Sequence, residues 1–287
     1  MDVNDNESTV INNSYDFDIS KKIAYPDIKS LVRLFFMLIA YMIIGGIILG
    51  IFLFESKSLN LQLSKPLLNL FFYIVTLLAT IRYAFKKNKK QQPSAFNVSF
   101  NKIRGWIVPV IIISTLALVV GLEGISNLIP MPQSVQKFFE SAFTKDTFSI
   151  VNIIIAAPIL EEILCRGIVL KGLLKNYSPE KAIVISAIFF SLIHLNPWQA
   201  LPAFFGGLFL GWVFYKTRSV IPGMIIHFTI NATASAFMFF PKQQQGFLSL
   251  LGEPYYIVLC IFSALVFVFG CLLIEKKYSI PNAVVNY

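Results

Sequence analysis

The chain has 287 residues, of which 56% are hydrophobic and only 14% are charged. Soluble globular domains are roughly 45–50% apolar and about 25% charged, so this composition excludes a soluble globular protein. It also excludes a disordered chain, a collagen-like fibre and a small disulfide scaffold. The formal charge is +9, from 24 basic and 15 acidic residues. The sequence therefore predicts a protein that lies mainly in a lipid bilayer.

The first segment in chain order is polar. Residues 1–28 hold several acidic and Asn side chains, and they lack the basic stretch and short apolar run of a signal peptide. We expect a cytosolic N-terminal tail. The three cysteines, Cys165, Cys260 and Cys271, fall inside apolar runs without metal-ligand spacing, which indicates simple packing.

Eight apolar stretches follow, each near the ~20 residues that a helix needs to cross a bilayer. The predicted fold class is therefore all-α, a polytopic bundle of about eight transmembrane helices. The fifth and sixth stretches are short and are separated only by Asn196 and Pro197, so full crossing by both stays open. The stretches are 31–54, 66–85, 106–122, 148–170, 182–196, 198–215, 219–240 and 255–274.

The basic residues indicate an orientation. If both termini are cytosolic, 18 of the 24 Lys and Arg residues fall in cytosolic segments and five in outer segments, with Arg166 inside a span. This split follows the positive-inside rule, so the net charge faces the cytosolic leaflet and nothing further supports nucleic-acid binding. We expect a multi-pass protein of a prokaryotic plasma membrane. Its oligomeric state stays open.

These features divide the chain into five parts. The outer loop has an amphipathic stretch from Val135 to Phe143, which favours an interfacial helix, with a lid or substrate gate as the alternative. Two GxxxG pairs, Gly46–Gly50 and Gly207–Gly211, predict close helix packing inside the protein. The parts are the tail 1–28, N-terminal transmembrane helices 29–122, an extracytoplasmic loop 123–147, a core 148–240, and a C-terminal transmembrane helix with a short tail 241–287.

Five ionisable residues interrupt the apolar stretches. Such groups cost several kcal/mol in hydrocarbon unless they are paired or lie in a wet cavity, so they indicate function. Glu162 and Arg166 are four residues apart and can form an ion pair on one helix face. Glu161 lies about 100° around the helix from Glu162 and has no obvious partner, so it can serve as a general base. The five are Glu161, Glu162, Arg166, His194 and His227.

Depth in the membrane brings these residues together. His227 and Asn231 are again four apart, which places an imidazole and an amide on one face. At 1.5 Å per residue, Glu161, His194, His227 and Asn231 each lie roughly 12–18 Å from the cytosolic ends of their helices. Four polar groups at one depth predict a single buried site.

The pattern resembles a known family. Glu161 to Arg166 matches EExxxR, Phe190 to His194 matches FxxxH, and His227 to Asn231 matches HxxxN. The chain thereby resembles the CPBP family, the CAAX prenyl protease 2 (Rce1-like) and bacteriocin-processing intramembrane endopeptidases, also called the Abi family. The motifs cover about residues 148–240.

The resemblance implies an eight-helix protease that cleaves a membrane-associated peptide or protein within the bilayer. It implies that Glu161 and His194 hold and activate a water molecule. It further implies that His227 and Asn231 form the oxyanion site, while Glu162 and Arg166 support the geometry. The residues agree with these roles, since Glu161 is the unpaired carboxylate and a His/Asn pair supplies hydrogen-bond donors.

Alternatives remain in cofactor and in function. One Glu and two His residues can form a zinc site, but HExxH is absent and no helix carries two histidines, so we expect no cofactor and keep zinc as the alternative. A bacteriocin-immunity or peptide-sequestering membrane protein is a non-enzymatic alternative. A proton-coupled transporter is another, although the absence of an internal repeat disfavours it.

Overall fold

The computed structural model describes residues 24–58, 64–91, 97–142 and 144–278, with the backbone alone at 138–142 and 242. Throughout these ranges the elements are helices, and the predicted all-α class is confirmed. The helices are α1 (Ile28–Ser58), α2 (Lys65–Gln91), α3 (Ile107–Ser126), α4 (Gln133–Ala142), α5 (Thr147–Val151), η1 (Asn152–Ala156), α6 (Ala157–Glu162), η2 (Ile163–Leu170), α7 (Lys171–Asn176), α8 (Pro179–Leu192), α9 (Pro197–Thr217), α10 (Val220–Phe237), η3 (Lys242–Gln244), α11 (Phe247–Leu251) and α12 (Glu253–Lys277).

Five helices are long and apolar enough to cross a membrane: α1, α2, α3, α10 and α12. The multi-pass character is thereby confirmed, whereas the count of eight crossings and the side of the termini stay predictions. Most of the expected tail 1–28 lies outside the described residues. The outer faces of α1 and α12 suit lipid, since Phe54 is 72% exposed and Leu265 is 67% exposed.

The fourth expected span is one long helical run from Thr147 to Asn176 that contains two π-helical stretches, η1 and η2. The π-helical stretch η1 ends two residues before Pro158, whose ring and missing N–H disturb a regular α-turn in the preceding residues. Asp146 caps the start of this run. Its slight burial raises the carboxyl pKa, but hydrogen bonds from Ser149, Thr144 and Phe148 outweigh this and lower the pKa to about 2.

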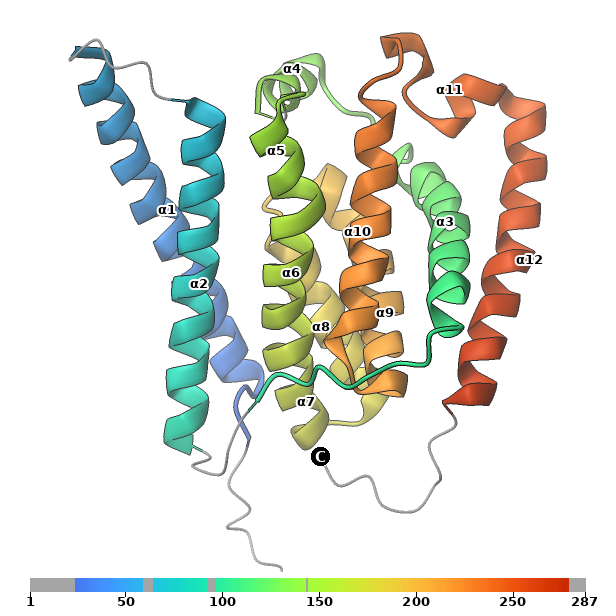
Figure 1. The fold of residues 1–287 in the computed structure, drawn as a ribbon, viewed down its shortest axis with the longest axis horizontal. Helices are drawn as coiled ribbons and strands as arrows, with labels where there is room; N and C mark the ends of the chain where they lie inside the picture. Colours follow the sequence, from blue (N-terminus) through green and yellow to red (C-terminus); the bar gives the residue numbers. More distant parts are fainter. Residues whose placement is uncertain (1–23, 59–63, 92–96, 143, 279–287) are drawn as a thin grey trace, which may run out of the picture.

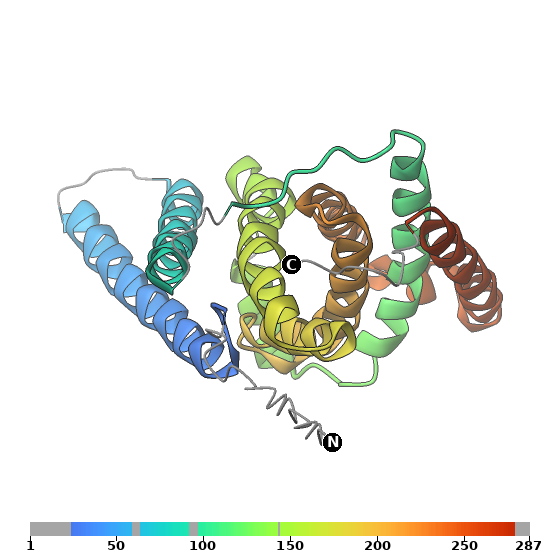
Figure 2. The same ribbon diagram turned by 90° about the horizontal axis from the view of Figure 1, so that it is seen from below.

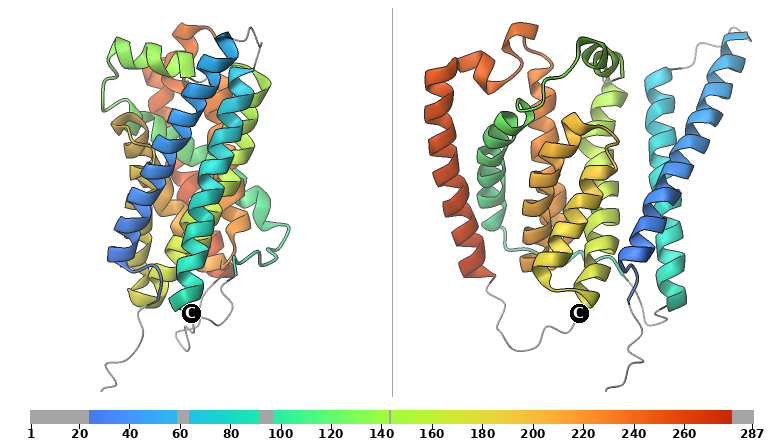
Figure 3. Two further views of the ribbon diagram at one scale, coloured as in Figure 1. Left: turned by 90° about the vertical axis from the view of Figure 1, so that its left-hand side faces the viewer. Right: turned by 180° about the vertical axis from the view of Figure 1, so that it is seen from behind.

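The fifth and sixth expected spans are α8 and α9, which form a hairpin (Figure 3). With 14 residues α8 is about 21 Å long, shorter than the ~30 Å hydrocarbon core. Leu195 has a φ of 56° and reverses the chain, and the Asn196 side chain caps α9 by accepting from the Gln199 N–H. His194 therefore lies in the turn after α8, and its expected position inside a helix was wrong.

The helices form three groups (Figures 1 and 2). The α1–α2 pair stands on one side, the run α5–α7 with α8, α9 and α10 makes the centre, and α3 with α12 stands on the other side. Figure 2 shows the α1–α2 pair splayed from the centre toward one edge. The apolar core lies in the central group, where Leu164, Ile168 and Ile226 have no exposed surface.

One end of the bundle, called here the basic end, gathers Lys and Arg residues from α2, α7, α9 and α12 (Figure 1). The segment 97–104 crosses this end in extended form. It is held there because Val220 N–H donates to the Ser99 carbonyl over 3.0 Å and the Ser219 hydroxyl donates to the Asn101 carbonyl over 2.8 Å. The opposite end, which carries α4 and α11, is called the far end.

The two GxxxG pairs behave differently. A Cβ at Gly207 would lie 3.2 Å from Ala187, and one at Gly211 would lie 3.1 Å from Ile183, so these glycines let α9 approach α8 closely. The packing prediction is confirmed for this pair. It was wrong for Gly46 and Gly50, because nothing lies within 4 Å of a Cβ at either position.

Candidate active site

A fully buried ion pair forms the base of the site. Arg166 Nη1 lies 2.7 Å from Glu162 Oε1, and neither side chain is exposed. Arg166 Nη2 donates to the Gly207 carbonyl over 3.1 Å, so the guanidinium also joins η2 to α9. A charged side chain is tolerated in a buried position only when it has such partners. The Glu162–Arg166 ion pair that the four-residue spacing predicts is confirmed.

The Phe190 ring connects this base to both histidines. Its centroid lies 4.4 Å from the Arg166 guanidinium carbon, a cation–π geometry. The same ring meets the His194 and His227 rings edge to face, with centroid distances of 5.2 and 5.4 Å. The Phe of the FxxxH motif thus fixes the relative positions of the two imidazoles and the guanidinium.

Two residues of α10 face the pair. His227 Nδ1 lies 3.3 Å from Glu162 Oε1, and the His227 side chain is 6% exposed. Asn231 Nδ2 donates to the Ile153 carbonyl of η1 over 2.8 Å, which leaves its second N–H for another acceptor. A Cβ at Gly223 would lie 2.6 Å from Glu162 Oε2, so a glycine is needed where α10 passes the carboxylate.

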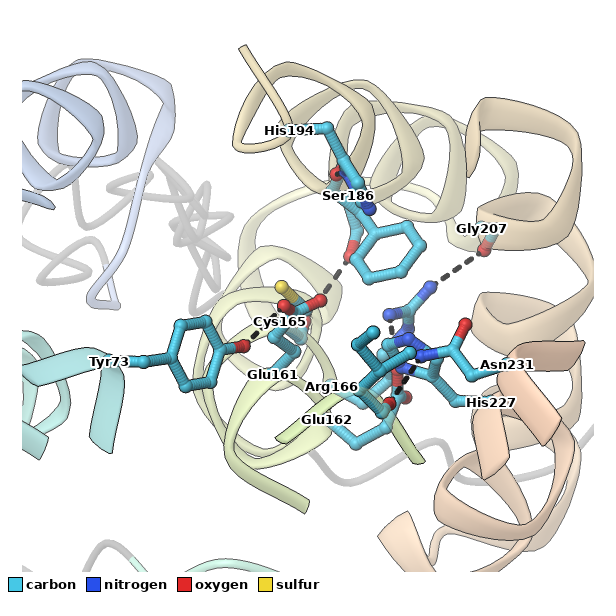
Figure 4. A network of polar contacts seen from close by, with 12 residues as sticks. Tyr73, Glu161, Glu162, Cys165, Arg166, Ser186, His194, Gly207, His227 and Asn231 are labelled. Carbon is cyan, nitrogen blue, oxygen red and sulfur yellow. Dashed lines mark hydrogen bonds and ion pairs between the residues drawn. The ribbon is translucent and has the colours of Figure 1, made fainter. Parts of the chain in front are cut away.

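Glu161 points to the other side of its helix, toward α2 (Figure 4). The Tyr73 hydroxyl donates to Glu161 Oε1 over 2.6 Å. The second oxygen, Oε2, is buried and has no hydrogen-bond partner among the described residues. A buried, unpartnered carboxylate oxygen at the wall of a cavity is suited to hold a water molecule.

The His194 ring has a defined orientation. Its Nδ1 lies 2.8 Å from the Phe190 carbonyl oxygen. A carbonyl only accepts, so Nδ1 carries a hydrogen, and in the neutral ring Nε2 then carries the lone pair. In this tautomer Nε2 is available as a proton acceptor.

Two cavities meet at these residues. One, of about 460 Å³, lies between the α1–α2 pair and the central helices, and Glu161, His194, His227 and Asn231 all line it. We call it the α1–α2 cavity. The other, of about 570 Å³, lies between α3, α9 and α10 and shares His194, Gln199, His227 and Asn231 with the first. We call it the α3–α10 cavity. The structure thus brings the six predicted site residues together, four at the cavities and two, Glu162 and Arg166, behind them.

Three further residues at the site were not found from the sequence. Tyr73 lies outside the motifs, and its contact with Glu161 depends on how α2 packs. Gln199 lines both cavities. The Asn196-Pro197 turn in the sequence predicts the start of α9 and so could have placed Gln199 in its first turn. Asn152 lines the α1–α2 cavity, and its buried side-chain oxygen has no partner among the described residues.

A zinc site does not fit this arrangement. Within the described ranges, no three His, Cys, Asp or Glu side chains cluster closely enough to hold a metal ion. Glu161 is oriented by Tyr73, while His227 directs its Nδ1 toward Glu162, so the carboxylate and the imidazole have separate partners.

Comparison with protein families matches residues 143–233 to "Type II CAAX prenyl endopeptidase Rce1-like". The matched range contains all three motifs. The CPBP resemblance is confirmed. Among curated proteins, a CAAX prenyl protease 2 of Methanococcus maripaludis is 28% identical to this chain over 181 residues. That alignment covers 54% of this chain and 66% of the relative, just under two thirds of its length. No solved structure matches the chain.

Proposed function

We propose that the protein is an intramembrane endopeptidase that hydrolyses a peptide bond of a membrane-associated protein or peptide. One observation carries this proposal: Glu161, His194, His227 and Asn231 line a single cavity inside a bundle of membrane-spanning helices. A carboxylate, a neutral imidazole acceptor and two donors are the groups that hydrolysis by water requires.

In this proposal water attacks the substrate directly. The water molecule is held by Glu161 Oε2 and His194 Nε2, which lie at the cavity wall. As the water oxygen bonds to the substrate carbonyl carbon, one proton of the water molecule moves to the pair formed by Glu161 and His194. The carbonyl oxygen becomes an oxyanion. The C–N bond then breaks, and the leaving nitrogen takes the proton, so the products are a carboxylic acid and an amine.

In the proposed mechanism His227 and Asn231 stabilise the oxyanion. The free N–H of Asn231 donates as a neutral group. His227 already directs Nδ1 to Glu162, so donation from Nε2 requires a hydrogen on both ring nitrogens, a form that the Glu162 carboxylate stabilises. Arg166 balances the charge of Glu162 when His227 is neutral. Removal of one oxyanion donor typically costs about 10²–10³ in kcat.

Tyr73 acts as a positioning residue. Its hydroxyl occupies Glu161 Oε1 and leaves Oε2 for the water molecule. Because Tyr73 belongs to α2, the catalytic carboxylate is oriented only when the α1–α2 pair is packed against the central helices. The substrate is a membrane-embedded peptide or protein, and the proposed mechanism uses no cofactor.

Comparative peptidomics tests this function. Membranes are compared from cells with wild-type protein, with Glu161→Gln, and with Glu180→Gln as a control at an exposed position on α8. The proposal predicts a set of peptides that disappears in Glu161→Gln and persists in Glu180→Gln. Identical peptides in all three membranes would contradict a protease. A peptide-sequestering protein or a transporter predicts that outcome.

A further inference from the structure

The α3–α10 cavity runs from an exposed rim to the half-buried His194 and the buried His227. Asn127 and Gln245 at the rim are exposed and Met131 is 40% exposed, whereas Leu210 and His227 on the floor are 1% and 5% exposed. The rim is formed where α3 and α10 end, at the far end of the bundle. By the positive-inside rule the basic end is cytosolic, so this cavity opens on the outer side.

The α1–α2 cavity has a different wall. Its side away from the catalytic residues is built by α1 and α2 and is mainly apolar, with Leu38, Met42, Leu49 and Phe72. Such a wall suits an apolar part of a substrate. It does not suit a charged group, which costs several kcal/mol near the middle of a bilayer.

Hydrolysis creates two such charged groups. Each turnover consumes one water molecule and produces one carboxylate and one amine, which becomes an ammonium in water. At least one of these products needs a polar route out of the bilayer. The α3–α10 cavity offers that route, since its rim is polar and it ends at the two histidines and Asn231.

The charge at the rim distinguishes the two products. Glu123 is the one acidic residue among the described side chains that line this cavity, and no Lys or Arg is among them. Its carboxylate is held in place because the Phe247 and Leu248 N–H groups donate to it over 2.8 and 2.9 Å. A fixed negative charge attracts an ammonium and repels a carboxylate.

We propose that the α3–α10 cavity admits the water molecule and releases the C-terminal fragment, the product with the new ammonium, on the outer side of the membrane. This inference rests on the proposed protease function. It assigns the substrate segment N-terminal to the scissile bond to the α1–α2 cavity, which has an apolar wall. The segment C-terminal to that bond is assigned to the α3–α10 cavity, which has a polar rim.

Cysteine labelling tests the opening of the cavity without requiring activity. In a background with Cys260 and Cys271 replaced by Ala, a membrane-impermeant maleimide is added to sealed vesicles of each orientation. Ser178→Cys marks the basic end of the bundle. We expect Ala203→Cys and Ala234→Cys, which lie in the cavity, to react with maleimide added on the opposite side of the membrane. Phe228→Cys, which faces apolar surroundings, should stay unlabelled from both sides. Failure of the cavity positions to react, or reaction only from the side of Ser178→Cys, overturns the proposal.

Filling the cavity tests the exit. Ala234 lines the cavity, whereas Ala236, on the same helix, does not. We expect Ala234→Leu to reduce the yield of C-terminal fragments in the peptidome at least about tenfold, with Ala236→Leu at the wild-type yield. An undiminished yield in Ala234→Leu overturns the exit proposal while leaving the protease function intact, whereas fragments that persist in Glu161→Gln contradict the protease function itself.

Discussion

Two ion pairs of nearly equal length differ in burial. Glu162–Arg166 spans 2.7 Å with both side chains fully buried, and Lys216–Glu275 spans 2.6 Å with side chains 12% and 48% exposed. Removing one partner of a buried pair leaves the other charge unpaired, which typically lowers the free energy of unfolding by about 3–5 kcal/mol. Loss of an exposed pair costs about 1 kcal/mol or less.

We therefore expect Glu162→Gln to lower the thermal unfolding midpoint in detergent by many degrees, because Arg166 then lacks its carboxylate partner. Lys216→Gln should leave the midpoint nearly unchanged. Equal shifts for the two variants would show that burial of Arg166 does not determine the stability of this region.

Tyr73 provides a second prediction at the residue scale. Tyr73→Phe removes one hydrogen bond to the charged Glu161, which is typically worth ~1.5–3 kcal/mol. The water molecule remains bound but Glu161 is less well oriented, so kcat should fall about tenfold or more with little change in KM. Tyr83→Phe, nearer the basic end of α2, is the matched control. A Tyr73→Phe enzyme with unchanged kcat and unfolding midpoint would remove Tyr73 from the mechanism.

The site was predictable where spacing within one helix determines contact. Glu162 and Arg166 form an ion pair across four residues, and His227 and Asn231, also four apart, line the same cavities, since this spacing brings side chains onto one face. Tyr73 was not predictable, because its contact with Glu161 joins residues 88 apart and depends on tertiary packing. The Glu162–His227 contact across 65 residues has the same origin.

At the scale of elements, the α8–α9 contact positions the base of the site. A Cβ at Gly207 would lie 3.2 Å from Ala187 and 3.3 Å from the Phe190 ring, closer than most packing contacts. Gly207→Ala should displace α9, which carries the carbonyl that accepts from Arg166, and should reduce both activity and stability.

Gly121→Ala is the matched control, because nothing lies within 4 Å of a Cβ at that position. Activity and unfolding midpoint are measured for both variants in the same detergent. The close-packing account fails if Gly207→Ala behaves like Gly121→Ala.

Element boundaries were only partly predictable. Apolar runs indicated all the long helices, but the end of α8 at Leu192 lies inside an apolar run and is determined by the reversal at Leu195 and the cap at Asn196. The two π-helical stretches before and after α6 could not be predicted from any clear pattern in the sequence. The first ends two residues before Pro158, and the second carries Arg166 of the buried ion pair.

At the scale of the whole molecule, the described side chains form no metal-binding cluster. We expect purified protein to keep its full rate of cleavage in a strong chelator, and added zinc to leave that rate unchanged. A zinc protease treated in parallel should lose activity. Loss of activity that zinc restores would require a rearranged site with Glu161, His194 and His227 as ligands.

The central claim concerns the water-activating role of Glu161, and one rate tests it most directly. The rate of cleavage is measured for purified wild-type and Glu161→Gln proteins with equal unfolding midpoints, on a substrate identified by peptidomics. Loss of a general base typically costs about 10²–10⁴-fold in rate, and the account predicts a loss in this range. Cleavage by Glu161→Gln at the wild-type rate would contradict it.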